Sequence, residues 1–318
     1  MLVQEMSLKN EILRLKKEKD VVILAHNYQI PDVQDVADFT GDSLGLSRQA
    51  AKVPQKTILF CGVHFMAETA AIICPEKRVL IPDLQAGCSL SDSITVEELR
   101  NWKTQHPDAI TVGYVNTTAE IKALTDIVCT SSNAVGIVQS IPKNQKIIFA
   151  PDKNLGNYIK SLTGRDMVIW EGSCHVHEEF SIERILELKK IHPDARIIAH
   201  PECKKPVLLI ADHIGSTSSL LKFTKENSAS KYIVATESGI IHQMKKDSPN
   251  KEFIPAPPID MSCACSDCNF MKLITIKKIY NCLKFEKPEI QVNEEIQKKA
   301  VHSIRRMLEI SKDLGLKK

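Results

Sequence analysis

The sequence predicts an α/β protein made of three similar three-layer αβα domains, whose parallel sheets surround a pseudo-threefold axis. The first observation is a repeated word, His-Pro-Asp-Ala, at residues 106–109 and again at 192–195, 86 positions later. In both places a helical segment ends at the word and an apolar strand follows. The segment "LKKEKDVVILAHNYQ" near the N-terminus is a looser third copy. A period this long indicates triplicated small domains and not a solenoid.

The second observation is that each copy continues with the same order of elements. A hydroxyl residue follows 17 positions after the polar residue that ends the first strand; the pairs are His26 and Ser43, Tyr114 and Ser131, and His200 and Thr217. Further strands are predicted at 57–61, 146–150 and 231–235, and the last strands lie in "RVLIPD", "MVIWEG" and "EFIPAP". Strands that alternate with helices in this way predict parallel sheets covered by helices.

The repeat also predicts domain boundaries. The first domain is expected to combine residues 1–86 with 270–318, which add terminal helices, while the second spans 87–172 and the third 173–269. In open parallel sheets, ligands bind outside the carboxyl ends of the strands. Three such domains around one axis could therefore share a central cavity.

The composition is that of an ordinary soluble globular protein. Hydrophobic residues make up 43% and charged residues 25% of the 318 positions, which excludes disordered and collagen-like classes. A net charge of +3 and an aromatic content of 5% argue against nucleic acid as a partner. The apolar runs are too short to cross a bilayer, and the charged N-terminal helix does not resemble a secretion signal. We therefore expect a cytoplasmic protein without membrane association.

Three cysteines that come after the last strand of each copy are the candidate metal ligands. Cys88 and Cys174 occupy equivalent positions, each 18 residues before a His-Pro-Asp-Ala word. In the third copy, "MSCACSDCNFMK" gathers Cys263, Cys265 and Cys268 within six residues. Tetrahedral zinc and most iron–sulfur sites need four ligands, and this stretch offers only three. We therefore expect one of its cysteines to act together with Cys88 and Cys174.

The other cysteines are expected to pack in the core. Cys61, Cys74, Cys129 and Cys282 lie in or beside apolar strands or helices, where cysteine behaves as a small hydrophobe. Cys203 lies beside a polar turn, and its role stays open. Disulfides are not expected, because a reducing compartment favours metal ligands, catalytic groups and buried thiols.

Three thiolates leave one coordination position open, which fits a catalytic site better than a structural one. Sulfur-only ligation favours an iron–sulfur cluster or zinc over hard cations. A [4Fe–4S] cluster held by three cysteines has one iron free to act as a Lewis acid on a substrate oxygen. This chemistry suits dehydration, in which a hydroxide leaving group has to be polarised.

Polar residues at the ends of the predicted strands are expected to line the same cavity. The acid–base candidates are His26, Tyr28, His200 and Glu202, the hydrogen-bond donors are Tyr114 and Asn116, and the hydroxyls are Ser43, Ser131 and Thr217. Histidine titrates near neutrality, and burial can bring glutamate there. Three hydroxyls at matched spacing and at helix N-termini favour an anion site, although an ordinary N-cap would also explain each one.

The motifs that carry these residues resemble the quinolinate synthase family, iron–sulfur enzymes of NAD biosynthesis. The resemblance covers nearly the whole chain and includes "LAHNYQIPDVQDVADFTGDS", "IPDLQAGCSLSDS", "YVNTTAEIKALTDIVCTSSNA", "EGSCHVHEEF", "AHPECKKPVLLIADHIGSTS" and "ATESGIIHQM". It implies condensation of iminoaspartate with dihydroxyacetone phosphate to quinolinate, with release of phosphate and water. It also implies functional coupling to an aspartate-oxidising enzyme that supplies the imine. The implied fold of three α/β domains around a central cluster agrees with the repeat.

The resemblance also implies roles for single residues. Cys88, Cys174 and Cys268 would bind a [4Fe–4S] cluster; Cys268 is chosen because the "NFM" after it is similar to the residues after the ligand in the family. Catalytic roles are implied for His26, Tyr28, Tyr114, His200 and Glu202, with Glu202 as the general base, and substrate binding for His26, Ser43, Tyr114, Asn116, Ser131, His200, Glu202 and Thr217. Glu237 and His242 resemble family residues near the cavity.

The same residues show one departure from the family and leave two alternatives open. Many relatives carry a CxxCxxC pattern, whereas a single residue separates Cys263 from Cys265 here, which puts a disulfide between them in doubt. The first alternative is another hydro-lyase with a three-cysteine cluster. The second is a non-enzymatic zinc-binding or cluster-binding protein, in which the cysteines of 263–268 would act with His242 or another nearby group.

Overall fold

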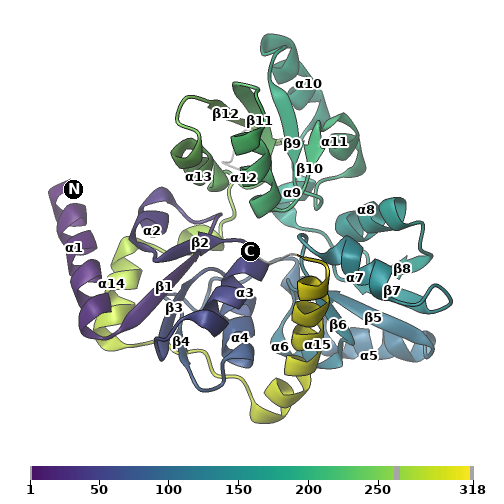
Figure 1. Ribbon diagram of the computed structural model, residues 1–318, viewed down its shortest axis with the longest axis horizontal. Coiled ribbons are helices and arrows are strands. Elements are labelled where there is room, and N and C mark those ends of the chain that lie inside the picture. The colour runs from purple at the N-terminus through teal and green to yellow at the C-terminus, as the bar shows by residue number, and fades with distance from the viewer. Residues whose placement is uncertain (1, 261–265, 316–318) are drawn as a thin grey trace.

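Three four-stranded parallel sheets with one shared strand order form the protein (Figure 1). The structure is a computed structural model that describes residues 2–260 and 266–315. In each sheet the first strand of the repeat lies between the second and the third, and the fourth pairs with the third. In sheet order, the strands are β2 (Phe39–Gly41), β1 (Val21–His26), β3 (Thr57–Cys61) and β4 (Arg78–Leu80); β6 (Ile127–Cys129), β5 (Ala109–Tyr114), β7 (Lys146–Ala150) and β8 (Met167–Ile169); and β10 (His213–Ile214), β9 (Arg196–Ala199), β11 (Lys231–Ala235) and β12 (Glu252–Pro255).

The strand predictions are confirmed. The three segments predicted at 57–61, 146–150 and 231–235 are β3, β7 and β11 with the same bounds. Each pairs in parallel with the first strand of its copy, so that Val21 lies opposite Thr57, Ala109 opposite Lys146, and Arg196 opposite Tyr232. All six residues of β1 are buried, as expected for a strand whose sheet is covered on both faces.

Helices cover the sheets and complete the predicted α/β architecture (Figure 1). In each unit, helices connect the successive parallel strands. The helices are α1 (Leu2–Glu18), α2 (Pro31–Val36), α3 (Ser43–Lys52), α4 (His64–Ile73), α5 (Val96–Gln105), α6 (Ala119–Leu124), α7 (Ala134–Ser140), α8 (Lys153–Thr163), α9 (His175–Glu178), α10 (Ile182–Ile191), α11 (Lys205–Ile210), α12 (Thr217–Glu226), α13 (Ile240–Asp247), α14 (Ile276–Phe285) and α15 (Glu294–Asp313). Two 3-10 turns, η1 (Ser91–Ser93) and η2 (Met271–Leu273), come shortly after two of the cysteines.

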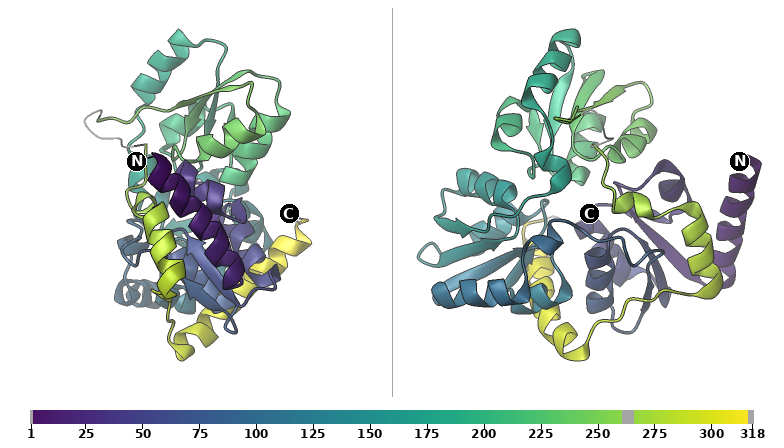
Figure 2. Two further views of the ribbon diagram at one scale, coloured as in Figure 1. Left: turned by 90° about the vertical axis from the view of Figure 1, so that its left-hand side faces the viewer. Right: turned by 180° about the vertical axis from the view of Figure 1, so that it is seen from behind.

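The last two helices join the units. Helix α14 packs beside α1 on the outside of the first sheet (Figure 2). Helix α15 packs against α6, α7 and β6 of the second sheet and also against α4 of the first. One continuous apolar cluster therefore includes residues of the first two sheets and of both C-terminal helices. The third sheet has separate clusters on its two faces.

The three units surround a common centre (Figure 1). The polar residues at the ends of β1, β5 and β9 all reach this centre, because the loops at the carboxyl ends of the strands are directed there. No helix in the described part of the chain is long and apolar enough to span a membrane.

Candidate active site

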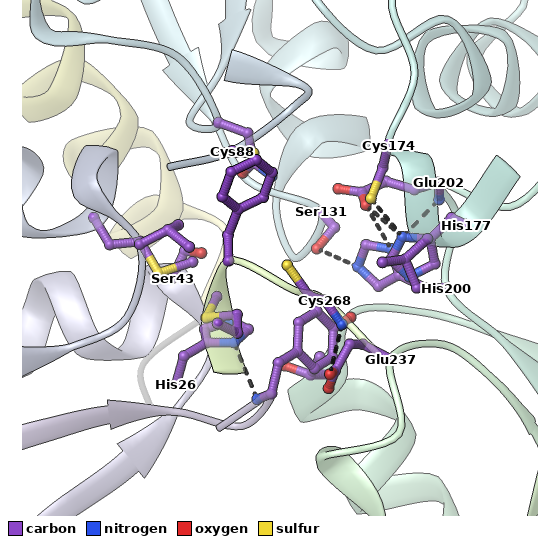
Figure 3. A pocket seen from close by; sticks show the side chains of 18 of the residues that line it. His26, Ser43, Cys88, Ser131, Cys174, His177, His200, Glu202, Glu237 and Cys268 are labelled. Atoms are coloured by element: carbon purple, nitrogen blue, oxygen red, sulfur yellow. Dashed lines mark hydrogen bonds and ion pairs between the residues drawn. The ribbon is translucent and has the colours of Figure 1, made fainter. Parts of the chain in front are cut away.

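One cavity lies where the three units meet (Figure 3). It contains about 690 Å³ of space between the protein atoms, part of it open to solvent. Its lining includes all twelve residues to which the resemblance assigns cluster binding, catalysis or substrate binding: His26, Tyr28, Ser43, Cys88, Tyr114, Asn116, Ser131, Cys174, His200, Glu202, Thr217 and Cys268. Residues up to 242 positions apart in the sequence therefore share one site.

The three candidate cysteines sit on equivalent turns. The carbonyl oxygen of each accepts a hydrogen bond from the backbone N–H four residues later: Asp92 to Cys88 at 3.0 Å, Glu178 to Cys174 at 2.9 Å, and Lys272 to Cys268 at 3.1 Å. This shared turn identifies Cys268 as the counterpart of the other two in the third copy. Cys263 and Cys265 lie outside the described residues.

The donor set fits a group that takes three thiolates. All three cysteines are half-buried free thiols that line the cavity, and each comes from a different loop. Burial raises the pKa of Cys88 to about 12 and that of Cys268 to about 11, and it also raises the pKa of Cys174. A buried cationic group would favour the thiolate forms that burial disfavours. Among the described cysteines no fourth one lines the cavity.

The cysteines assigned to the core are buried as predicted. Cys61, Cys74, Cys129 and Cys282 are all at most 2% exposed. Cys203, whose role the sequence left open, is also fully buried, and its thiol donates to the carbonyl oxygen of Ala235 at 3.2 Å. None of these five lines the cavity.

A chain of hydrogen bonds crosses the cavity wall and connects two tyrosines. The Tyr114 hydroxyl donates to Oε1 of Glu202 at 2.5 Å, and Oε2 of Glu202 lies 2.8 Å from Nδ1 of His177. On its other side, Nε2 of His177 is 2.9 Å from Oγ1 of Thr236, which is 2.6 Å from the Tyr28 hydroxyl. Figure 3 shows His177 and Glu202 grouped beside Cys174. This chain of hydrogen bonds can hold a proton or pass one between Tyr28 and Glu202.

His177 and Thr236 are site residues that the sequence interpretation missed. His177 lies three residues after Cys174, one turn along α9, and its Nδ1 is 3.2 Å from the Cys174 sulfur. Thr236 comes directly after β11, at the same end of the sheet as the predicted polar residues. Both signals were present in the sequence: a histidine one helical turn from a candidate ligand, and a hydroxyl at the carboxyl end of a buried strand.

Ionisation of the buried acid–base groups is set by burial and by their partners. Burial lowers the pKa of His26 to about 4 and that of His200 to about 3, so both are neutral near pH 7. Burial also raises the pKa of Tyr28 and of Tyr114 well above the usual value, which keeps both hydroxyls protonated. Burial alone would raise the pKa of Glu202, but His200, His177 and the hydrogen bonds it accepts lower it to about 2. Glu202 is therefore an ionised carboxylate near pH 7, and its pKa is lowered, not brought near neutrality as expected from burial alone.

None of the three matched hydroxyls is the N-cap of its helix; Ser131 precedes α7, whose N-cap is Asn133. Helix α3 is capped by Asp42, whose side chain accepts from the N–H of Gly45, and α12 is capped by Ser216. Ser43 and Thr217 are the first residues inside these helices. Their hydroxyls are therefore available to the cavity, and the capping explanation does not hold for them.

The hydroxyls of the second and third copies already have polar neighbours. Ser131 Oγ is 3.1 Å from Nε2 of His200, and Oγ1 of Thr217 accepts from the side-chain amide of Asn27 at 3.0 Å. Each of these contacts joins two units. The anion-binding candidates thus also hold the cavity walls together.

Glu237 and His242 behave differently. Glu237 lines the cavity and is buried. His242 is not among the lining residues; its Nε2 lies 2.8 Å from Oδ1 of Asp35 on α2, at the contact between the first and third units. His242 therefore pairs with Asp35 and does not line the cavity of Cys88, Cys174 and Cys268, whereas Cys263 and Cys265, its partners in the alternative site, lie outside the described residues.

Comparison with known proteins gives one consistent result. The family model described as Quinolinate synthetase A protein matches residues 10–309. A quinolinate synthase of Microcystis aeruginosa is 57% identical over 300 residues, which cover 94% of each chain. The quinolinate synthase of Chloroherpeton thalassium is 54% identical over 310 residues, which cover 98% of this chain and 96% of the relative. The quinolinate synthase of Trichormus variabilis is 58% identical over 297 residues, which cover 93% of this chain and 91% of the relative.

Proposed function

The chain belongs to the quinolinate synthase family, and we propose that it performs the reaction of this family with a [4Fe–4S] cluster bound by Cys88, Cys174 and Cys268. The enzyme condenses iminoaspartate with dihydroxyacetone phosphate to quinolinate and releases phosphate and water. The observation that carries the cofactor proposal is the set of three cysteines on equivalent turns around one cavity. A structural zinc site would be closed by four protein ligands, whereas three of the described cysteines line this cavity; His177 and Glu202 are further potential ligands beside Cys174, and we propose them as proton-transfer groups instead.

The cofactor and the hydroxyls would divide the work of binding and activation. When bound, a cluster with three cysteine ligands supplies a Lewis acid that polarises a departing hydroxyl group. Ser43, Ser131 and Thr217 lie around the cavity, and their hydroxyls can donate to the phosphate of the triose and to the carboxylates of iminoaspartate. The neutral imidazoles of His26 and His200 can donate to a carbonyl oxygen without adding charge.

Glu202 is the proposed general base for proton transfers in condensation and ring closure. Its carboxylate is ionised, buried and within hydrogen-bond distance of two donors, Tyr114 and His177. A proton that Glu202 accepts can be balanced by one that Tyr28 gives, since Thr236 and His177 connect the two groups. Burial of this path away from water also protects a reactive imine from hydrolysis.

We extend the proposal to the surroundings of the enzyme and to its domain organisation. A cytoplasmic location and functional coupling to an aspartate-oxidising enzyme fit a substrate that is an unstable imine. The proposed domains are residues 1–86 with 270–318, 87–172 and 173–269. The packing of α15 on both the first and second units means that this helix is shared between two of them.

The cofactor proposal predicts the metal content of the protein. After strictly anaerobic purification we expect about four irons and about four acid-labile sulfides per chain, since the open iron requires an intact cluster. The visible absorption should bleach on exposure to air. Iron, sulfide and zinc assays with a visible spectrum measure this. One tightly bound zinc without sulfide, in protein never exposed to air, would overturn the cofactor.

The proton path predicts a loss of turnover in Thr236→Val. Valine keeps the shape of this fully buried residue but removes the oxygen between Tyr28 and His177. We expect kcat to fall by roughly 10- to 100-fold because the buried Tyr28 hydroxyl and the buried Nε2 of His177 both lose their hydrogen-bond partner, with KM changed by less than about threefold.

The matched control for this variant is Thr224→Val. Thr224 is also buried, and its hydroxyl donates to the Leu221 carbonyl within α12, outside the cavity. The measurement is steady-state kinetics of both variants at equal cluster content, and it compares their kcat values. Equal kcat values for Thr236→Val and Thr224→Val would exclude the proton path.

A further inference from the structure

Glu237 is a buried carboxylate that has two partners on the segment that carries Cys268. It lies just after β11 and is 1% exposed. Its Oε1 accepts from the backbone N–H of Cys268 at 3.1 Å (Figure 3) and lies 2.6 Å from Nζ of Lys272. Its Oε2 accepts from the backbone N–H of Gly239 at 2.8 Å. The carboxylate therefore binds both the cysteine backbone and a cation four residues later.

Lys272 connects this carboxylate to the first unit. The same ammonium group that pairs with Glu237 donates to the backbone carbonyl of Tyr28 at 2.9 Å. The Lys272 backbone N–H closes the turn that begins at Cys268. One side chain thus contacts the loop of Tyr28 and the loop of Glu237, while its own backbone belongs to the Cys268 turn.

The turn at residues 237–239 is enclosed between these two segments. On one side, the backbone N–H of Ser238 donates to the carbonyl oxygen of Ser266 at 3.0 Å. On the other side, a Cβ atom added to Gly239 would lie 2.7 Å from the Tyr28 carbonyl carbon, so only glycine allows this approach. Any movement of this turn would therefore change its contacts with both the Tyr28 loop and the Cys268 segment.

We propose that Glu237 and Lys272 form a positioning pair that holds the Tyr28 loop and the Cys268 turn against one another. The pair thereby fixes the position of a tyrosine of the first unit relative to a thiolate ligand. The inference rests on the proposed function of Tyr28 and Cys268. Neither member of the pair is required to touch a reacting atom. Charge compensation is what makes the pair effective, because a carboxylate this deeply buried needs its cation, and loss of either partner leaves the other uncompensated.

Hydrogen exchange on the full-length, cluster-free chain tests the proposal without relying on activity. In Lys272→Met and in Glu237→Gln, amides of residues 266–273 and of the loop around Tyr28 should exchange at least about fivefold faster than in the wild type. Lys272→Arg, which keeps the charge, should stay within about twofold. The matched control is Lys246→Met, which removes an ion pair with Asp35 between the same two units but outside the cavity lining.

A second measurement uses the cluster-loaded protein. Iron release to an excess of chelator under anaerobic conditions should be at least about threefold faster in Lys272→Met and Glu237→Gln. The double variant should release iron no faster than the worse single variant, because the two residues act as one pair.

The outcomes separate this proposal from the cofactor proposal. Unchanged local exchange in both single variants, or the same change in Lys246→Met, would overturn the positioning pair. Lys272→Met could destabilise the whole protein, in which case amides throughout the chain would exchange faster. The isosteric variant Glu237→Gln then provides the test, and faster exchange over the whole chain in that variant as well would also overturn the positioning pair. A wild-type protein without iron would overturn the cofactor proposal, whereas the exchange experiment would still test the pair.

Discussion

Replacing Cys88 with alanine is expected to abolish the iron–sulfur cluster and with it quinolinate formation. Cys88 lies on a loop that is remote in sequence from Cys174 and Cys268 but shares their cavity. With one of three protein ligands lost, the iron content should drop from about four to less than about one per chain. Cys174→Ala should give the same result. Iron and sulfide assays and the visible spectrum of anaerobically purified variants measure the effect.

The control for the cysteine variants is Cys282→Ala. Cys282 is a buried free thiol on α14 that does not line the cavity, so its loss removes a thiol from the core without touching the proposed ligands. This variant should retain the iron and sulfide of the wild type. If Cys88→Ala and Cys174→Ala both retained their metal, the site would have to lie within the 263–268 stretch, and the distributed cluster would be rejected.

The fold could be predicted because the repeat is visible twice over, in the His-Pro-Asp-Ala word and in the spacing of polar residues. Once parallel strands are inferred, their carboxyl ends have to point to one edge, and residues such as Tyr114 and Glu202 are placed there. The placement of α15 could not be predicted in the same way. Its apolar face, with Ile304 and Met307, fits any apolar surface, and only the assembled units bring α4 and α6 together as its packing surface.

The candidate site was predicted as a list of residues, but its connections were not. Sequence spacing brings Tyr28 and Glu202 to the same cavity and says nothing of Thr236 and His177 between them. Hydrogen-bond partners depend on side-chain directions across units, which no local pattern contains. The same holds for Glu237: the sequence indicated a residue near the cavity, and the structure adds its contacts with the Cys268 segment.

Glu202→Gln should reduce kcat by roughly 10²- to 10⁴-fold, the range expected for loss of a general base. Glutamine keeps the size of the side chain but cannot accept a proton at neutral pH. Its amide can still accept from the Tyr114 hydroxyl, while the second acceptor for His177 is lost. Because Glu202 is not one of the three proposed ligands, the variant should retain its iron. Steady-state kinetics together with iron analysis distinguish the two effects.

The control is Glu178→Gln, a nearby acid on α9 that pairs with Lys153 and accepts from Asn154 but does not line the cavity. It should keep kcat within about twofold of the wild type. A loss in Glu202→Gln that is fully explained by missing iron would make Glu202 a residue that supports the cluster and not the base. A kcat near that of the wild type, with full iron content, would mean that another residue performs the proton transfers. Tyr28, at the other end of the hydrogen-bonded chain, would then be the remaining candidate.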